Sequence, residues 1–298
     1  MKIALIGICQ IVGMQEALRA LLPDASVTYH HVRLEGVERI VEELPSCDLV
    51  ISQVVPSHNV PALTGGRLRE IGVRKLEEIP PIVFAGFHPD LHMIADQGKP
   101  LVSPIESYHS LILAASFLLG LPERQAVGLF NRLIYRRLGY SARFEASKAL
   151  MKRALAPSNY DVVVDRYWDD WMKKGCFMHT PNHPTIRVLA TFATVAAERA
   201  GLVGPGTPVP DGLPDLLNDQ HRWAVYPELA EDFGIPSDMI FKRYKRGEIS
   251  EEERTLDLGA FAKESYEIFR TSDIGLLEND PSIVRTAETI RGVLSRET

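Results

Sequence analysis

The first third of the chain alternates short apolar segments with amphipathic segments, and this alternation constrains the fold more than any other feature. Short apolar strands separated by helical periodicity are typical of a parallel sheet covered by helices. Strands are expected at residues 2–6, 26–31, 48–53 and 82–85, and helices at residues 14–22, 37–44 and 67–78. The pattern predicts an α/β fold that begins with a small, Rossmann-like parallel sheet.

After about Pro104 the sequence pattern becomes mainly helical. Helices are expected at residues 106–119, 122–138, 142–155, 160–174, 184–200, 256–270 and 281–295. Residues 201–214 are rich in glycine and proline, which predicts a loop or linker. We therefore expect two parts, an α/β subdomain over residues 1–104 and a mainly helical part over residues 105–298, which together form one pocket.

Composition argues against several classes of protein. The chain has 298 residues, of which 45% are hydrophobic and 24% charged, and this is ordinary for a soluble globular protein. Its net charge of −6 gives no sign of nucleic-acid binding. The three cysteines are too few and too widely spaced for a disulfide framework or a zinc finger, and they favour a cytoplasmic location. No transmembrane segment is expected, and a homo-oligomer is left open.

Polar residues follow three of the predicted strands, at the point where each strand ends. Gly7-Ile8-Cys9-Gln10 follows the first strand, Ser52-Gln53 ends the third, and Gly86-Phe87-His88-Pro89-Asp90 follows the fourth. Because the carboxyl ends of parallel strands meet at one edge of a sheet, these side chains are expected to converge there. Their convergence predicts a ligand-binding or active site.

Cys9 is the first candidate for chemistry. Gly7 permits a tight turn or a close approach of the backbone. Cys9 would then face the N-terminus of the next helix, whose positive dipole end favours a thiolate. The alternative is a small buried cysteine in a strand-to-helix turn, since cysteines that form no disulfide are among the most buried residues.

His183 is the second candidate. The proline after it suits the first turn of a helix, so His183 would lie near the positive end of that helix and stay neutral, as a general base requires. Asn182 would orient the ring or donate to an oxyanion. His88 would line the pocket, held by the proline that follows it, and Asp90 would bind substrate or cap a turn. The alternative is that these residues are only helix caps and turn residues.

No metal site and no nucleotide-hydrolysis motif is expected. His88 with His92 and His179 with His183 have the spacing of zinc pairs, but a proline interrupts each pair and an acidic partner is missing. Walker and Gly-x-Gly-x-x-Gly motifs are absent, which disfavours ATP hydrolysis and nicotinamide chemistry. Local basic groups are available for an anionic ligand: Arg67, Arg69, Arg74, Lys75, Arg132, Arg136, Arg137 and the run 242–246.

In this order and spacing, the three motifs resemble those of the WcbI-type acetyltransferases of bacterial capsular polysaccharide biosynthesis. The resemblance runs from Met1 to about Lys242. The Gly-Asn-Cys-Gln motif of that family is matched by residues 7–10, its Gly-aromatic-His-Pro-Asp motif by residues 86–90, and its Asn-His-Pro motif by residues 182–184. One position differs, because Ile8 stands where the family has asparagine.

The resemblance implies an α/β subdomain within a mainly helical, cradle-like fold. It also implies a pocket for coenzyme A or acetyl-coenzyme A, and transfer of an acetyl group to a carbohydrate hydroxyl. The matched residues that would contact the coenzyme are Gly7, Cys9, Gln10, His88, Asn182 and His183.

Two chemical routes are compatible with these residues. In one, Cys9 takes the acyl group as a thioester and His183 activates the acceptor hydroxyl. In the other, His183 or His88 deprotonates the acceptor directly. In both, Gln10, Gln53 and Asn182 would donate to the tetrahedral oxyanion. Two other functions remain open: an SGNH-like esterase with cysteine in the place of serine, and a non-catalytic protein that binds coenzyme A or a glycan.

Overall fold

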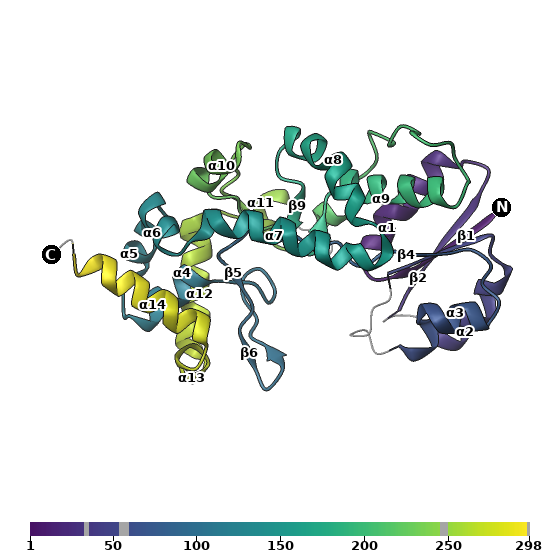
Figure 1. Cartoon of the computed structure of the whole chain (residues 1–298). Coiled ribbons are helices and arrows are strands. Elements are labelled where there is room, and N and C mark those ends of the chain that lie inside the picture. Colours follow the sequence, from purple (N-terminus) through teal and green to yellow (C-terminus); the bar gives the residue numbers. More distant parts are fainter. Residues whose placement is uncertain (33–35, 54–59, 245–249, 297–298) are drawn as a thin grey trace. The chain divides into compact units, whose positions relative to one another are not determined.

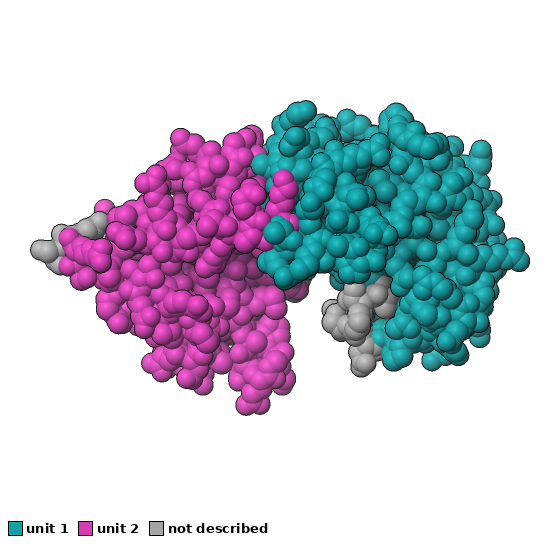
Figure 2. Space-filling view, in the orientation of Figure 1, with its two compact units in different colours: residues 1–84, 149–218 teal, residues 85–148, 219–298 magenta. Residues whose placement is uncertain are grey.

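The computed structural model describes residues 1–32, 36–53, 60–244 and 250–296 (Figure 1). Contacts divide the chain into two compact units, coloured separately in Figure 2. Unit 1 comprises residues 1–84 and 149–218, and unit 2 comprises residues 85–148 and 219–298. The two consecutive parts predicted from the sequence, 1–104 and 105–298, and their common pocket stay predictions.

A four-stranded parallel sheet is the framework of unit 1, as the alternating sequence pattern predicts. Its strands are β1 (Lys2–Gly7), β2 (Ser26–His31), β3 (Leu49–Ser52) and β4 (Leu76–Glu78), in the order β2-β1-β3-β4. β1 is buried from its second residue onward and β3 along its whole length, as expected for strands of a parallel sheet that is covered on both faces. The sheet therefore brings the ends of β1 and β3 side by side, with Ile6 opposite Ser52.

Helices pack against this sheet and against one another. The helices of unit 1 are α1 (Gln10–Leu21), α2 (Val37–Glu43), α3 (Gly65–Glu70), α8 (Asp161–Lys173) and α9 (Ile186–Arg199), and α7 (Tyr140–Leu155) begins in unit 2 and ends in unit 1. The hairpin of β9 (Met178–Thr180) and β10 (His183–Pro184) precedes α9. Helix α1 lies along α9 (Figure 1), so closely that a Cβ at Gly13 would lie 2.5 Å from Cδ1 of Leu189.

Two elements that the sequence predicts in the first part of the chain are wrong. The predicted helix at residues 67–78 is instead α3 followed by β4, because Gly72 has a φ of +96° and ends the helical turn. The predicted strand at residues 82–85 is not a strand. The two prolines before it have no N–H to donate, and the backbone groups of Ile82 bond to the Gln10 side chain, at 2.9 and 3.0 Å, instead of to a neighbouring strand.

Unit 2 is mainly helical, as the second part of the sequence predicts. Its helices are α4 (Leu111–Leu118), α5 (Glu123–Gly128), α6 (Arg132–Arg137), α10 (Pro227–Phe233), α11 (Glu251–Arg254), α12 (Leu258–Thr271), α13 (Gly275–Glu278) and α14 (Pro281–Leu294). Its short strand pairs are β5 (Leu91–His92) with β8 (His109–Ser110), β6 (Ala95–Asp96) with β7 (Lys99–Pro100), and β11 (Phe241–Lys242) with β12 (Thr255–Leu256). The apolar helix α4 is buried in the core, against α12 and α14.

Two helices predicted in unit 2 have other boundaries. The one predicted at residues 106–119 begins only at Leu111, because β8 uses the residues before it and Ser110 caps α4 by accepting from the Leu113 N–H. The one predicted at residues 122–138 is two helices, α5 and α6. They are separate because the Asn131 side chain caps α6 by accepting from the Ile134 N–H.

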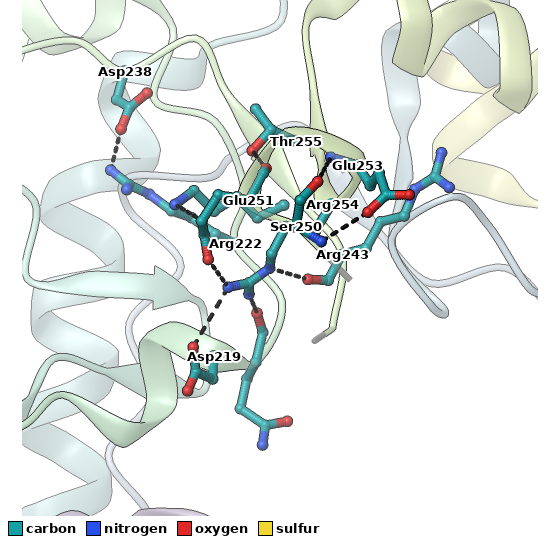
Figure 3. A network of polar contacts seen from close by, with 11 residues as sticks. Asp219, Arg222, Asp238, Arg243, Ser250, Glu251, Glu253, Arg254 and Thr255 are labelled. Atoms are coloured by element: carbon teal, nitrogen blue, oxygen red, sulfur yellow. Dashed lines mark hydrogen bonds and ion pairs between the residues drawn. The ribbon is translucent and has the colours of Figure 1, made fainter. Parts of the chain in front are cut away.

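A network of polar contacts surrounds Arg254 in unit 2 (Figure 3). The Arg254 side chain is fully buried, with 0% exposed, and its guanidinium donates to the backbone oxygens of Arg243 and Gln220. Its charge is balanced by Glu251, with 2.8 Å between Nη1 and Oε1. A buried charge must be paired and hydrogen-bonded, so this network ties α11 to β11 and to the start of the second segment of unit 2.

Candidate functional site

Gln10 joins four separate segments of unit 1. It is the first residue of α1 and only 1% exposed. Its Nε2 donates to the backbone oxygens of Ile82 and Asn182, each at 2.9 Å. Its Oε1 accepts from the Ile82 N–H at 3.0 Å and from Nε2 of Gln53 at 3.2 Å. Both amide hydrogens are therefore used, one on the segment after β4 and one on the β9–β10 turn, and the amide oxygen holds Gln53 after β3.

The end of β1 approaches Gln53 very closely. A Cβ at Gly7 would lie 3.0 Å from the Gln53 Cβ and 2.7 Å from Cγ2 of Ile11. Only glycine fits at this position without displacing one of these side chains, which agrees with the close approach expected from the sequence. Ile8 packs against the hydrophobic cluster on one face of the sheet, so it adds an apolar contact where the related sequence motif has a hydrogen-bonding amide.

Cys9 is the N-cap residue of α1, directly before Gln10. It is half-buried and is a thiol, not part of a disulfide. The Cys9 side chain makes no capping hydrogen bond to the N–H groups that begin this helix of 12 residues. A thiolate at Cys9, favoured by the positive end of the helix dipole, stays a prediction.

The β9–β10 hairpin holds His183 through Thr180. His183 is 8% exposed, and its Nδ1 lies 2.8 Å from Oγ1 of Thr180. The same hydroxyl donates to Oδ1 of Asn182 at 2.9 Å. A hydroxyl has one proton, so Thr180 must accept from Nδ1–H of His183. In the neutral ring the lone pair is then on Nε2, which is the form that a general base needs.

Thr180 is a candidate site residue that sequence reasoning misses. It lies in β9, pairs with His183 in the hairpin, and is fully buried. The only signal in the sequence is a threonine three residues before a histidine, with a proline between them. Such a pattern is too common to be informative unless the hairpin is known.

His88 and Asp90 belong to unit 2. His88 is buried, and its ring packs edge-on to Phe87. Asp90 is fully buried and accepts hydrogen bonds from the hydroxyls of Tyr140 and Tyr226, each at 2.7 Å, and from the Ile112 N–H at 3.0 Å. Burial raises the pKa of the Asp90 carboxyl. Asp90 thus caps α4 and joins it to the α7 and α10 segments.

The predicted site residues therefore fall into two groups. Unit 1 brings Gly7, Cys9, Gln10, Gln53, Asn182 and His183 together at the loops beside the sheet edge. His88 and Asp90 lie in unit 2, and their contribution to the same pocket stays a prediction. Among the described residues, no group of three or more histidine, cysteine or acidic side chains could hold a metal ion. Nor is any helix in the described part of the chain long and apolar enough to cross a membrane.

Comparison with known proteins gives one family and one solved structure. Residues 2–205 match the family model described as the polysaccharide biosynthesis enzyme WcbI. One solved structure matches with a TM-score of 0.72, covering 97% of this chain and 98% of that chain at 13% sequence identity. It is described as WcbI, a novel polysaccharide biosynthesis enzyme, in its native form without a disulfide bond between coenzyme A and a cysteine. No curated protein matches. The structural likeness confirms the predicted mixed α/β fold.

Proposed function

Because the chain belongs to the WcbI family of polysaccharide biosynthesis enzymes, we propose that it transfers an acyl group from an acyl-coenzyme A to a carbohydrate hydroxyl. The observation that carries the proposal is the hydrogen-bonded series from Asn182 through Thr180 to His183, in which a neutral imidazole would have its lone pair on Nε2. Cys9 supports it, since the solved family member is described in terms of coenzyme A and a cysteine.

The direct route uses His183 as the base. Its Nε2 takes the proton of the acceptor hydroxyl as the oxygen attacks the thioester carbonyl, and the tetrahedral oxyanion receives hydrogen bonds from the Asn182 amide. When the C–S bond breaks, coenzyme A leaves as a thiolate, and His183 gives the proton to that thiolate. The acceptor hydroxyl hydrogen thus ends on the sulfur of coenzyme A.

The covalent route adds one step at Cys9. Its thiolate attacks the thioester first, coenzyme A leaves as a thiolate, and the acyl group is held on Cys9. The acceptor hydroxyl then gives its proton to His183 and attacks the acyl carbon, Cys9 leaves as a thiolate, and His183 passes the proton to the coenzyme A thiolate. The two routes share His183 and differ in Cys9. Gln10 is a positioning residue in both, because its amide hydrogens are held by Ile82 and Asn182.

The first test is calorimetric titration of the full chain with coenzyme A and acetyl-coenzyme A, followed by an acyl-transfer assay on a panel of sugars. We expect saturable binding near one per chain and transfer to an acceptor. Hydrolysis of aryl acetates without coenzyme A would support an esterase instead, and binding without turnover would support a binding protein. Absence of binding to either ligand would contradict the proposal.

Variants of Cys9 separate the two routes. Cys9→Ala abolishes transfer if the acyl group passes through the sulfur, and it leaves most of the turnover if the acceptor attacks directly. Cys176→Ala is the matched control, because it removes another half-buried thiol of unit 1 that the mechanism does not use. Equal rates in the Cys9→Ala variant and in the control eliminate the covalent route.

Thr180→Val tests the role of the hairpin. The valine has nearly the same shape but cannot accept from Nδ1–H, so the ring is no longer held in the productive tautomer. We expect kcat to fall about 10–100-fold with little change in KM, by analogy with the loss of other groups that orient a reactive histidine. Thr180→Ser keeps the hydroxyl and should restore most of the rate, whereas an equal loss in both variants would indicate a packing role.

A further inference from the structure

Unit 2 contains a cavity of about 320 Å³ in which three arginines meet. They are Arg137 at the end of α6, Arg143 in α7 and Arg285 in α14. The rest of the lining is His92, the hydroxyl side chains Ser282, Thr286 and Thr289, and the leucines Leu91, Leu111 and Leu138. All of these residues belong to unit 2 (magenta in Figure 2), and no acidic side chain is among them.

The positive charge of this cavity is not neutralised within unit 2. Among the described residues, neither Arg137 nor Arg285 forms an ion pair with any side chain; the ion pairs of nearby helices involve other arginines, such as Arg132 with Asp232. Arg143 donates to the Pro89 oxygen at 2.8 Å and lies over the Tyr140 ring, contacts that hold its guanidinium but leave its charge unbalanced. All three arginines are exposed, so water can reach them, and an anion bound between them would add the charge pairing that the protein does not supply.

The carboxylate next to the cavity is already paired. Asp280, which caps α14, lies 2.8 Å from Nε2 of His92. The hydroxyls of Thr286 and Thr289 donate to carbonyl oxygens of their own helix. The groups left to bind a ligand are therefore the arginine side chains. Each planar guanidinium can donate two parallel hydrogen bonds to two oxygens of one phosphate.

We propose that this cavity binds a phosphate-bearing group of a small molecule. Its volume is at the small end of the range of about 300–1,000 Å³ for small-molecule sites, which suits a diphosphate or the phosphorylated end of a larger ligand. Phosphate is favoured over carboxylate because three arginines line one cavity, and phosphate offers more oxygens for their guanidinium groups to bind.

Two small molecules could supply such a group. One is the phosphorylated nucleotide end of coenzyme A, and the other is a sugar phosphate that serves as acceptor. Assignment to either source rests on the proposed function, whereas binding of phosphate as such does not. The two sources share the same chemistry at the arginines and differ in what is attached to it.

The test is calorimetric titration of the full chain with inorganic pyrophosphate, in the wild-type protein and in the double variant Arg137→Gln/Arg285→Gln. We expect affinity to fall tenfold or more in the double variant, since two of the three guanidinium groups that would bind the phosphate oxygens are removed. The matched control is Arg136→Gln/Arg291→Gln. It removes the same charge from exposed positions of α6 and α14 that do not line the cavity, and its affinity should stay close to that of the wild type.

Competition then identifies the source. Displacement of pyrophosphate by adenosine 3′,5′-bisphosphate assigns the cavity to coenzyme A, and displacement by glucose 1-phosphate assigns it to a phosphorylated acceptor. The proposal is overturned if pyrophosphate does not bind, or if the two double variants lose the same affinity. The protein could bind pyrophosphate through Arg137 and Arg285 without binding acetyl-coenzyme A. That result would support the phosphate site and overturn the proposed acyl transfer.

Discussion

Gln10 donates both hydrogens of its amide to backbone oxygens and receives two hydrogen bonds on its own oxygen. The sequence predicts that Gln10 lies at the edge of the sheet, because a polar residue after a buried strand has to be there. It does not predict which partners occupy the amide, because Ile82 and Asn182 are distant in the sequence. Nor does the sequence predict the partners of Thr180, whose hydroxyl is hydrogen-bonded to both Asn182 and His183 within the hairpin.

Burial of His109 makes stability depend on pH. Its Nε2 bonds to the Leu101 oxygen at 3.0 Å, and burial lowers the pKa of the ring to about 4, from about 6.5 in the unfolded chain. As the pH falls below about 6.5, the unfolded chain binds a proton that the folded protein does not bind. The free energy of unfolding therefore decreases, by roughly 2–3 kcal/mol between pH 7 and pH 4.5 from this residue alone.

His109→Gln checks this expectation. The amide can still donate to Leu101 but does not titrate in this range. Urea unfolding of both proteins at pH 7 and pH 4.5 should show a smaller loss of stability in the variant. An equal loss in the two proteins would mean that the ring is not buried in its neutral form.

At the scale of elements, the alternating pattern correctly predicts β1, β2 and β3. β1 and β3 are apolar because they are buried on both faces, whereas β2 is an edge strand with exposed residues. The pattern fails at residues 82–85, where the same apolar run is present. Prolines and the Gln10 side chain replace the ladder there. Apolar sequence signals burial, and burial alone does not distinguish a strand from an extended segment bonded to a side chain.

Contact between α1 and α9 depends on Gly13. The methyl group of Gly13→Ala would meet the Leu189 side chain at 2.5 Å, so this buried side chain or one of the helices must shift. We expect a loss of about 1–3 kcal/mol in the free energy of unfolding. Gly128→Ala in α5 is the control, since a Cβ there has no atom within 4 Å, and it should be neutral or stabilise by up to about 1 kcal/mol. Thermal or urea unfolding compares the two, and equal effects would contradict this account of the packing.

At the scale of the whole molecule, the chain passes between its units after Phe84, Lys148 and Asn218. The sequence shows where the composition changes. It does not show that a later segment belongs to the same unit as an earlier one, because that depends on contacts between segments that are distant in the sequence. Helices α8 and α9 therefore read as part of the helical half, although they belong to the unit of the sheet.

This organisation predicts the behaviour of fragments. Residues 1–104 alone lack α9, so the face of α1 at Gly13 that packs against Leu189 stays in water, and we expect no cooperative thermal transition. A chain that joins residues 1–84 to residues 149–218 through a flexible linker contains all of unit 1 and should unfold cooperatively. Circular dichroism during heating distinguishes the two, and cooperative unfolding of the shorter fragment would contradict the division.

The bond from Gln10 to the backbone of Asn182 spans 172 residues of sequence. A ribosome adds about 5–20 residues per second, so Gln10 is made roughly 10–35 s before Asn182. During that time the face of α1 that will meet α9 is exposed to the cell. The order of synthesis therefore leaves the segments around Gln10 incompletely assembled until more than half of the protein has been made, and it opens an interval in which a chaperone can hold the new N-terminus.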